Sequence, residues 1–182
     1  MALIAVLALV PDAVLDLRYA TADNFVGRPL YPVAAALLRR PAAERLAKAA
    51  AILRADGLRL VVYDAYRPLS AQRAMWAAKP DARFVADPKK GSSHNRGGAV
   101  DAGLADARGR PLPMPTDFDD FGPKAAHGAK GVSPAAARNA ARLKAAMEAA
   151  GFVSYAAEWW HYRDPDATAW PLLDEPLTEV AP

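Results

Sequence analysis

The stretch "SPAAARNAARLKAAMEAAGFVSYAAEWWHYRD", residues 133–164, sets a helical pattern directly before a strand pattern. Ser133 is a typical N-cap residue and Gly151 a typical helix stop, so the first part predicts a helix over 133–151. The second part, 152–164, is aromatic and apolar and predicts one or two strands. This stretch therefore indicates a fold that combines helices with strands.

Segments nearer the N-terminus extend this mixture. Apolar residues recur at helical spacing over 41–57, and Gly57 suits the end of that helix. The apolar run at 58–66 predicts a buried strand. The segment 70–79 predicts a second helix with Ser70 as its N-cap.

Three other segments are expected to be largely irregular. The segment 14–32 predicts a strand followed by a loop, and 83–106 predicts a glycine-containing loop that enters a strand. Residues 107–133 are rich in glycine and proline without a sustained period, which predicts a long loop. Loops of this length are usually functional or disordered, so we expect functional side chains at loops and strand ends.

Helices and strands do not alternate in a regular βαβ order along this chain. The predicted class is therefore α+β, a mainly antiparallel sheet with helices packed on it. A length of 182 residues, 53% of them hydrophobic, suits one domain spanning 1–182. We find no internal repeat and no linker that would divide it.

Composition narrows the possible functions. The chain has 23 Lys+Arg and 20 Asp+Glu, a formal charge of +3, which gives little support to nucleic-acid binding. It has no cysteine, so disulfides and thiolate metal ligands are excluded. Any metal site must draw on carboxylates and on the three histidines, His94, His127 and His161.

The apolar start "MALIAVLALV" has ten residues, too few to span a bilayer. No basic segment precedes it and no A-x-A-like cleavage site follows, so a strand or buried segment is expected rather than a signal peptide. We expect no membrane partner and a cytoplasmic location; a periplasmic one would apply if a leader had been removed. The sequence leaves the oligomeric state open.

The motif "SSHNRGGAVD" (92–101) places His94 seven residues before Asp101, with Gly97 and Gly98 between them. If His94 lies in a loop and Asp101 on the following strand, the glycines let the backbone turn so that both side chains converge. The spacing is common by chance, so the pair alone is a weak candidate for metal binding.

The motif "EWWH" supplies Glu158 and His161 in an otherwise apolar segment. In a strand, positions i and i+3 face opposite sides, so the two side chains converge only if the strand bends or bulges. Asp164 and Pro165 soon follow, which favours a bend. Taken alone, the segment is better interpreted as an aromatic core stretch with a solvent-facing glutamate.

Together, His94, Asp101 and His161 supply three nitrogen or oxygen ligands and leave a fourth position open to water, which is typical of a catalytic zinc site. Zinc lowers the pKa of bound water towards ~7 and polarises a carbonyl. Glu158 would then act as the general base. One Zn²⁺ per chain is the predicted cofactor.

Two further polar residues have competing interpretations. Arg67, at the end of the strand predicted over 58–66, would stabilise a developing oxyanion; the alternative is a surface ion pair with Asp64 or another acid. His127 lies in the long loop and is interpreted as a surface histidine rather than a ligand.

Five segments resemble the D-alanyl-D-alanine dipeptidases of the VanX type, zinc peptidases related to bacterial D,D-carboxypeptidases and to the Hedgehog-type fold. Each motif is modest alone, but five in the right order are highly specific. The segments are "DLRYATADNFVG" (16–27), "YDAYRPLSAQ" (63–72), "SSHNRGGAVD" (92–101), "MPTDFD" (114–119) and "EWWHY" (158–162).

The resemblance implies the same roles for the three metal ligands, the base and the arginine. It adds substrate contacts, with Ser92 and Tyr19 near the dipeptide and Asp119 on its free ammonium. The family pattern "MGTxFD" reads "MPTDFD" here, with proline in place of glycine. Asp117 and Asp120 therefore stay alternatives to Asp119.

The implied activity is zinc-dependent hydrolysis of D-Ala-D-Ala, in glycopeptide resistance or in recycling of cell-wall dipeptide. The partner would be a small dipeptide, with longer peptides excluded by a wall from the loop 107–133. Trp159 and Trp160 would pack around the site and shield it from water. The alternatives are a D,D- or L,D-carboxypeptidase acting on peptidoglycan stem peptides, and an inactive metal-bound cell-wall binding module.

Overall fold

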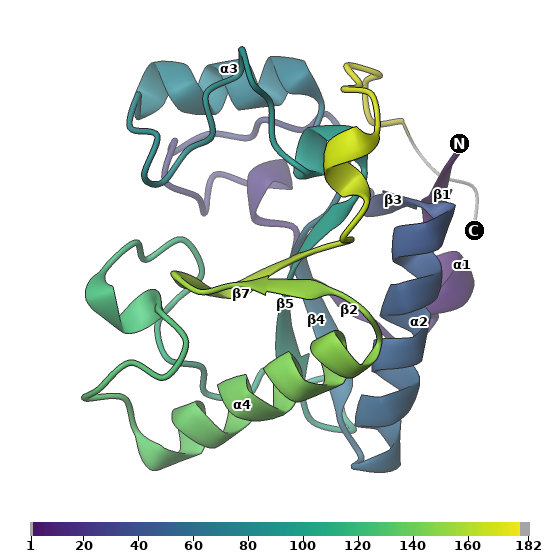
Figure 1. Ribbon diagram of the computed structural model, residues 1–182, viewed down its shortest axis with the longest axis vertical. Helices are drawn as coiled ribbons and strands as arrows, with labels where there is room; N and C mark the ends of the chain where they lie inside the picture. Colours follow the sequence, from purple (N-terminus) through teal and green to yellow (C-terminus); the bar gives the residue numbers. More distant parts are fainter. Residues whose placement is uncertain (1, 179–182) are drawn as a thin grey trace.

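The computed structural model describes residues 2–178 and is built around a five-stranded sheet with the order β2-β4-β5-β7-β6. β2 runs parallel to β4, and the other neighbours are antiparallel (Figure 1). The predicted α+β class with a mainly antiparallel sheet is confirmed. The strands are Val14–Leu15 (β2), Arg59–Asp64 (β4), Ala99–Ala105 (β5), Val153–Tyr155 (β6) and Glu158–Arg163 (β7).

Two long helices, α2 (Arg40–Ala55) and α4 (Pro134–Ala149), pack against each other and against the sheet. Their buried faces are largely alanine, with Leu46 and Leu53 on α2 and Leu143 on α4. Small side chains at helical spacing let the helices approach closely, so these faces join one hydrophobic core with the sheet.

The third long helix, α3 (Leu69–Ala78), lies across the sheet from α4 (Figure 1). Loops and short 3₁₀ turns carry Tyr19, Ser92, His94 and Asp119, whereas Asp101, Glu158 and His161 lie on strands. The 3₁₀ turns of the described chain are Arg18–Ala20 (η1), His94–Arg96 (η2), Pro123–Ala125 (η3) and Ala167–Ala169 (η4).

The apolar N-terminal segment forms a strand and a single helical turn. β1 (Leu3–Ala5) pairs antiparallel with β3 (Leu37–Arg39) in a separate two-stranded sheet, and α1 (Val6–Leu9) follows directly. Val6 is buried, as expected for an apolar start that joins the core. None of the helices within residues 2–178 combines the length and apolar character that a membrane span requires.

The ends of α2 and α4 follow the predicted signals. The Ser133 hydroxyl accepts a hydrogen bond from the Ala136 N–H at 3.2 Å, so the N-cap is confirmed. α2 ends at Ala55, and Gly57 adopts the left-handed φ of +71° that favours glycine after a helix.

The predicted N-cap of α3 is wrong. Ser70 lies inside the first turn, and Pro68 occupies the N-cap position without a side-chain capping bond. The Ser70 backbone N–H instead donates to the Asp174 carboxylate at 2.6 Å. A carboxylate from the C-terminal tail therefore caps this helix, and local sequence gives no signal of such a distant partner.

The hairpin of β6 and β7 is irregular, as the convergence of the Glu158 and His161 side chains requires. Ser154 pairs with Tyr162, but the next residue, Tyr155, pairs with Glu158. The residues 159–161 have no counterpart on β6, so β7 departs from a regular strand at this point. The predicted bend or bulge is confirmed.

The long segment 107–133 is a loop, as predicted, with the 3₁₀ turn η3 and an isolated bridge from Pro111 to Ala105. It packs against the domain, because Phe118 and Ala125 are buried. Asp119 and Phe121 of this loop line the same cavity as the other polar candidates.

Candidate active site

The centre of the site is formed by His94, Asp101 and His161, which come from three separate elements. His94 opens η2, Asp101 lies on β5, and His161 lies on β7. β5 and β7 pair so that Asp101 stands directly opposite His161. The Gly97 φ of +65° turns the chain from η2 into β5. The predicted convergence of His94 on Asp101 thus rests on a turn that glycine favours.

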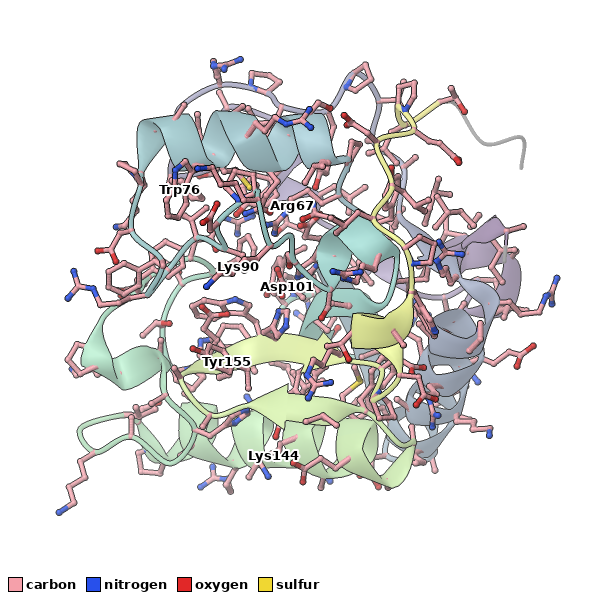
Figure 2. The ribbon with its side chains drawn as sticks, turned by 45° about the horizontal axis from the view of Figure 1, so that its top comes forward. Arg67, Trp76, Lys90, Asp101, Lys144 and Tyr155 are labelled. Atoms are coloured by element: carbon pink, nitrogen blue, oxygen red, sulfur yellow. The ribbon has the colours of Figure 1, made fainter. Side chains whose placement is uncertain are left out.

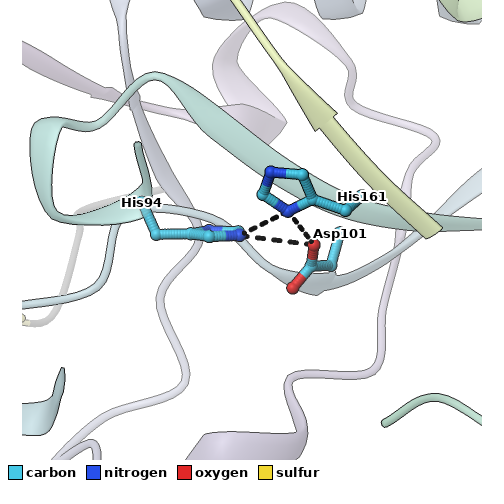
Figure 3. Close-up of side chains that lie close together, drawn as sticks. All are labelled: His94, Asp101 and His161. Carbon is cyan, nitrogen blue, oxygen red and sulfur yellow. Dashed lines mark hydrogen bonds and ion pairs between the residues drawn. The ribbon is translucent and has the colours of Figure 1, made fainter. Parts of the chain in front are cut away.

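The three side chains meet through single atoms (Figure 3). The His94 Nε2 lies 3.1 Å from the His161 Nδ1 and 3.3 Å from the Asp101 Oδ1. The His161 Nδ1 lies 3.0 Å from the same Asp101 oxygen. Two imidazole nitrogens and a carboxylate oxygen therefore form a compact triangle.

The ring of His94 is oriented by its second nitrogen. Its Nδ1–H donates to the Ala65 carbonyl oxygen at 2.7 Å, so Nε2 carries the lone pair when the ring is in the neutral form that metal binding requires. A backbone acceptor on the far nitrogen is the usual partner of a metal-binding histidine. The contact therefore directs the lone pair of His94 towards the other two ligand atoms.

The donor set fits a divalent metal ion. Zn–N and Zn–O bonds of about 2.0–2.1 Å in a tetrahedron place neighbouring ligand atoms roughly 3.3 Å apart. The separations of 3.0–3.3 Å among the three atoms are close to that value. Within residues 2–178, this is the one cluster of at least three such side chains that could hold a metal.

The electrostatics of the three groups favour an anionic carboxylate between two histidines. Burial raises the pKa of Asp101, but His94 and the hydrogen bonds from both histidines outweigh burial and hold the pKa far below its usual value. Burial, with nearby His94 and Arg67, lowers the pKa of His161. Asp101 therefore stays ionised and His161 neutral at pH 7, as metal ligands must be.

Glu158 lines the same cavity as the triangle. Burial raises the pKa of this carboxyl group to about 8, and the charges of Asp101 and Asp119 add to the effect. The irregular register of β7 lets Glu158 and His161 face one cavity although they are three residues apart. The interpretation as a solvent-facing core glutamate is therefore wrong.

Arg67 also lines the cavity. The structure agrees in part with each of its two interpretations, a residue beside the reaction centre and an ion pair with Asp64. It does pair with Asp64, at 2.6 Å, but the pair is buried rather than exposed on the surface. Its Nη2 lies 4.0 Å from the Asp101 Oδ2, beside the His-Asp-His triangle. Arg67, Asp101 and Tyr155, which are labelled in Figure 2, all line this cavity.

The cavity has a volume of about 220 Å³. All eight residues predicted for the site line it, including the substrate-binding candidates: Tyr19, Arg67, Ser92, His94, Asp101, Asp119, Glu158 and His161. The loop histidine His127 lies elsewhere, with its ring near Tyr162, and it is half-buried rather than a surface residue.

The three candidate acids of the long loop separate clearly. Asp119 lines the cavity, whereas Asp117 and Asp120 are exposed and do not line it. The Tyr19 hydroxyl donates to the Asp119 Oδ2 at 2.5 Å. Burial raises the pKa of Asp119 to about 7, although the bond from Tyr19 acts in the opposite direction.

The two tryptophans of "EWWH" are buried, as expected for packing residues. Trp160 lines the cavity, and the indole N–H of Trp159 donates to the Thr116 hydroxyl at 2.9 Å. That bond ties β7 to the long loop. Trp160 therefore forms part of the wall around the polar groups, and Trp159 anchors the strand behind it to the loop.

The sequence analysis missed the aromatic side of the cavity. Phe25, Phe84 and Phe121 come from three loops and line it together, with Phe84 and Phe121 centroids 5.1 Å apart. It also missed Gln72, which accepts a hydrogen bond from Arg67. Loop phenylalanines without periodicity carry no sequence signal for a shared wall.

A mainly antiparallel α+β fold with a His-Asp-His triangle, a half-buried glutamate and a buried arginine around one small cavity is typical of a metallopeptidase. A family model described as D-ala-D-ala dipeptidase matches residues 1–181. The chain belongs to this metal-dependent peptidase family.

Characterised relatives cover most of the chain. It is 42% identical over 171 residues to the D-alanyl-D-alanine dipeptidase of Escherichia coli K12, covering 94% of this chain and 89% of that protein. It is 36% identical over 168 residues to the protein of that name from Enterococcus faecium, covering 81% and 83%. It is 35% identical over 186 residues to the one from Enterococcus faecalis, covering 91% and 88%.

Proposed function

We propose that this protein is a zinc-dependent dipeptidase that hydrolyses D-Ala-D-Ala to two D-alanines. The observation that carries the proposal is the convergence of three ligand atoms, a carboxyl group and a guanidinium on a single cavity of about 220 Å³. Family membership and relatives named D-alanyl-D-alanine dipeptidase support the same substrate.

In this proposal the His94 Nε2, an Asp101 carboxylate oxygen and the His161 Nδ1 hold the zinc ion. Bound zinc would supply a Lewis acid that polarises the scissile carbonyl and lowers the pKa of the attacking water. The hydrogen bond from His94 to the Ala65 carbonyl fixes the ring before the ion arrives.

Glu158 would serve as the general base and then as the general acid. As the water oxygen bonds to the carbonyl carbon, the carboxylate takes a proton from the water; as the C–N bond breaks, it returns that proton to the leaving amino group. Its pKa is raised to about 8 in the metal-free protein, and the charge of a bound cation would lower it and favour the carboxylate form that a general base needs.

Arg67 would stabilise the negative charge that develops on the carbonyl oxygen. Its guanidinium is buried at the cavity wall, where water does not screen it well. Its position beside Asp101 supports a role next to the metal rather than at the entrance.

The substrate's free ammonium would pair with Asp119, whose carboxylate already accepts the Tyr19 hydroxyl. An ammonium favours the ionised form of a carboxyl group whose pKa is about 7. Ser92 lines the cavity beside His94 and offers a hydroxyl to the dipeptide backbone. Of the three acids considered for the ammonium, Asp119 has this support.

Restriction to dipeptides would follow from the enclosure of the ammonium site. A peptide extended at its N-terminus would leave Asp119 without its charged partner and would meet the rings of Phe25 and Phe121. These contacts favour a dipeptidase over a carboxypeptidase that accepts stem peptides. The presence of Glu158 and Arg67 at the cavity argues against an inactive binding module.

The decisive experiment compares substrates and one variant. We expect the zinc-loaded protein to hydrolyse D-Ala-D-Ala faster than L,D and L,L dipeptides and far faster than a stem pentapeptide. Glu158→Ala should bind one zinc ion per chain while its turnover falls by roughly 100- to 10,000-fold. Preference for the pentapeptide would favour the carboxypeptidase, and normal turnover by the variant would exclude the mechanism.

Location and pathway remain predictions. We expect the protein in the cytoplasm, and its recovery with the periplasmic fraction of the cells that encode it would contradict this.

Glycopeptide resistance and dipeptide recycling can be separated by deleting the coding sequence. Resistance predicts increased glycopeptide sensitivity, whereas recycling predicts poor growth on D-Ala-D-Ala without any change in sensitivity.

A further inference from the structure

The guanidinium of Arg67 is held on two sides by buried acceptors. Its Nε and Nη2 donate to the Asp64 Oδ2 at 2.9 and 2.6 Å. Its Nη1 donates to the Gln72 Oε1 at 2.8 Å. Gln72 is fixed in turn, because its amide donates to the Ala86 carbonyl at 2.8 Å. The side chain of Arg67 thus has a single supported orientation.

These contacts leave a defined part of Arg67 for substrate. A guanidinium has five N–H groups in a planar fork. Three of them are used by Asp64 and Gln72, which leaves one N–H on Nη1 and one on Nη2. Nη2 is also the atom that lies 4.0 Å from the Asp101 Oδ2, at the metal-binding triangle. The two acceptors therefore select which edge of the fork reaches the reaction centre.

Asp64 is placed for this task by a bulge in β4. Val62 pairs with Ala102 of β5, but Asp64 pairs with Asp101, so Tyr63 is an extra residue on β4. The bulge brings Asp64 opposite the metal-ligating candidate Asp101. It also buries the Asp64 carboxylate completely, with 0% of the residue exposed.

The second oxygen of Asp64 has its own fixed partner. The Tyr31 hydroxyl donates to the Asp64 Oδ1 at 2.6 Å. Both oxygens are therefore occupied, one by Tyr31 and one by Arg67. A buried carboxylate with fixed bonds on both oxygens offers little freedom to the guanidinium that it holds.

We infer that Asp64 is a positioning residue of the catalytic machinery, which acts through Arg67 by turning its Nη1 and Nη2 edge towards the developing oxyanion. Gln72 supports the same orientation from the other side. The inference rests on the proposed function, because it assigns Asp64 a part in the charge stabilisation ascribed to Arg67. Asp64 itself does not line the cavity.

Two rival roles for Asp64 must be separated from this one. Its Oδ2 also lies 3.7 Å from the His94 Nδ1, so it could act by orienting a metal ligand. It could also serve only as the buried partner that lets Arg67 fold into the domain. The first rival predicts weaker metal binding, and the second predicts lost stability without a specific loss in kcat.

The main experiment is a double-mutant cycle on the zinc-loaded protein with Asp64→Asn and Arg67→Ala. Asparagine keeps the shape and an acceptor oxygen but removes the charge that holds the guanidinium. We expect Asp64→Asn to lower kcat roughly 100-fold, as misplacement of a catalytic group does, with KM little changed. In the Arg67→Ala background the same change should cause no further loss, because the group it positions is gone.

Chemical rescue of Arg67→Ala by guanidinium ion distinguishes a positioning role of Asp64 from a purely structural one. Guanidinium ion added to Arg67→Ala should restore part of the activity, and Asp64→Asn in the same chain should abolish that rescue. Calorimetric titration of guanidinium into the metal-free proteins gives a readout independent of turnover. We expect binding to Arg67→Ala and much weaker binding to the double variant.

Asp164→Asn is the matched control, because Asp164 is also 0% exposed and paired with an arginine, Arg45, at 2.8 Å, but it does not line the cavity. This variant should lose stability while keeping kcat. If Asp64→Asn does not fold, Gln72→Leu tests the other support and should lower kcat by a smaller factor. Retained kcat in that folded variant would contradict the inference.

Three outcomes would overturn the inference: additive losses in the double variant, rescue by guanidinium that persists without the Asp64 carboxylate, or a weakened zinc affinity of Asp64→Asn in competition with a chelator. Failure of the proposed function looks different. In that case Arg67→Ala alone would leave the hydrolysis of D-Ala-D-Ala unchanged.

Discussion

At the scale of single residues, the site depends on two carboxyl groups whose environment favours the neutral form. Burial raises the pKa of Glu158 to about 8 and that of Asp119 to about 7. Each also feels the charge of Asp101, which the two histidines keep ionised. One small cavity therefore contains a permanent anion and two acids that titrate near neutrality, the range in which a general base must work.

The raised pKa of Glu158 predicts that metal binding releases protons. In the metal-free protein most of this group is protonated at pH 7, because its pKa is about 8. A divalent cation beside it favours the carboxylate, lowers the pKa and expels the proton. Metal affinity should therefore rise with pH as the pH approaches 8 and change less above it.

Calorimetry of zinc binding at pH 7, in buffers of different ionisation enthalpy, measures the number of protons released. Glu158→Gln should release fewer protons than the native chain, and its affinity should depend less on pH. The exposed acid Asp117 provides the control, since Asp117→Asn should leave the count unchanged. Equal counts in the native and Glu158→Gln proteins would contradict the expected protonation state.

At the scale of elements, irregularities in two strands, β4 and β7, bring the polar side chains of the site together. The extra residue on β4 sets Asp64 opposite Asp101, and the irregular pairing of β7 lets Glu158 and His161 face one cavity. Regular strands would send neighbouring polar groups to opposite faces. The position of the site residues thus depends on the irregularities of β4 and β7 as well as on the register of the strands.

The capping of α3 gives a test at the same scale. Asp174→Ala should lower the free energy of unfolding by about 1 kcal/mol, because the Ser70 backbone N–H loses its acceptor. Ser70→Ala should be nearly neutral, since the Ser70 hydroxyl forms no capping bond to this helix. Urea unfolding of both variants measures the difference. A larger loss of unfolding free energy in Ser70→Ala than in Asp174→Ala would support Ser70 as the N-cap, as the sequence suggested.

At the scale of the whole molecule, distant segments close one cavity. The ring of Phe121 lies 5.9 Å from Phe25 and 5.1 Å from Phe84 between centroids, so three loops meet over the site. The Lys79 ammonium lies 4.6 Å above the Phe84 ring and 5.0 Å above the Phe121 ring, which links two of these loops. In the proposed function, selection of substrate size would therefore depend on tertiary packing.

Phe121→Ala should weaken selection for short substrates. Removing the ring opens the wall beside the ammonium site, so we expect the ratio of tripeptide to dipeptide hydrolysis to rise while zinc is retained. Competition assays with D-Ala-D-Ala and D-Ala-D-Ala-D-Ala measure this ratio. Ile52→Ala, an exposed change on α2 outside the cavity, serves as the control. An unchanged ratio in Phe121→Ala would place the size filter elsewhere.

Metal binding should also stabilise the folded domain, because its ligands come from η2, β5 and β7 and meet only when these are packed. Zinc at 100 times its dissociation constant would add about 2.7 kcal/mol. For a chain of this size that corresponds to roughly 5–11 °C in Tm. Calorimetric scans with and without chelator measure the shift. His161→Ala should show a much smaller one, and equal shifts would contradict the ligand set.

Much of this protein could be predicted from the amino-acid sequence, for local reasons. The Ser133 cap, the Gly57 stop and the apolar run of β4 act within a few residues, so pattern alone located these elements. The chemistry of Glu158 and His161 even required an irregular strand, which β7 has. Side-chain type and spacing named His94, Asp101, His161, Glu158 and Arg67, and the family resemblance added Tyr19, Ser92 and Asp119; all eight are among the residues that line the cavity.

Only the tertiary structure decided the features that depend on distant partners. Asp174 replaced Ser70 as the cap of α3, and Asp119 was separated from two neighbouring acids. Asp64 became the buried partner of Arg67 through a bulge that leaves no sequence signal. These partners are set by two properties of the folded chain: which polar groups are buried away from water, and which groups far apart in the sequence come into contact. Local sequence sets propensities, whereas burial and long-range contacts choose among them.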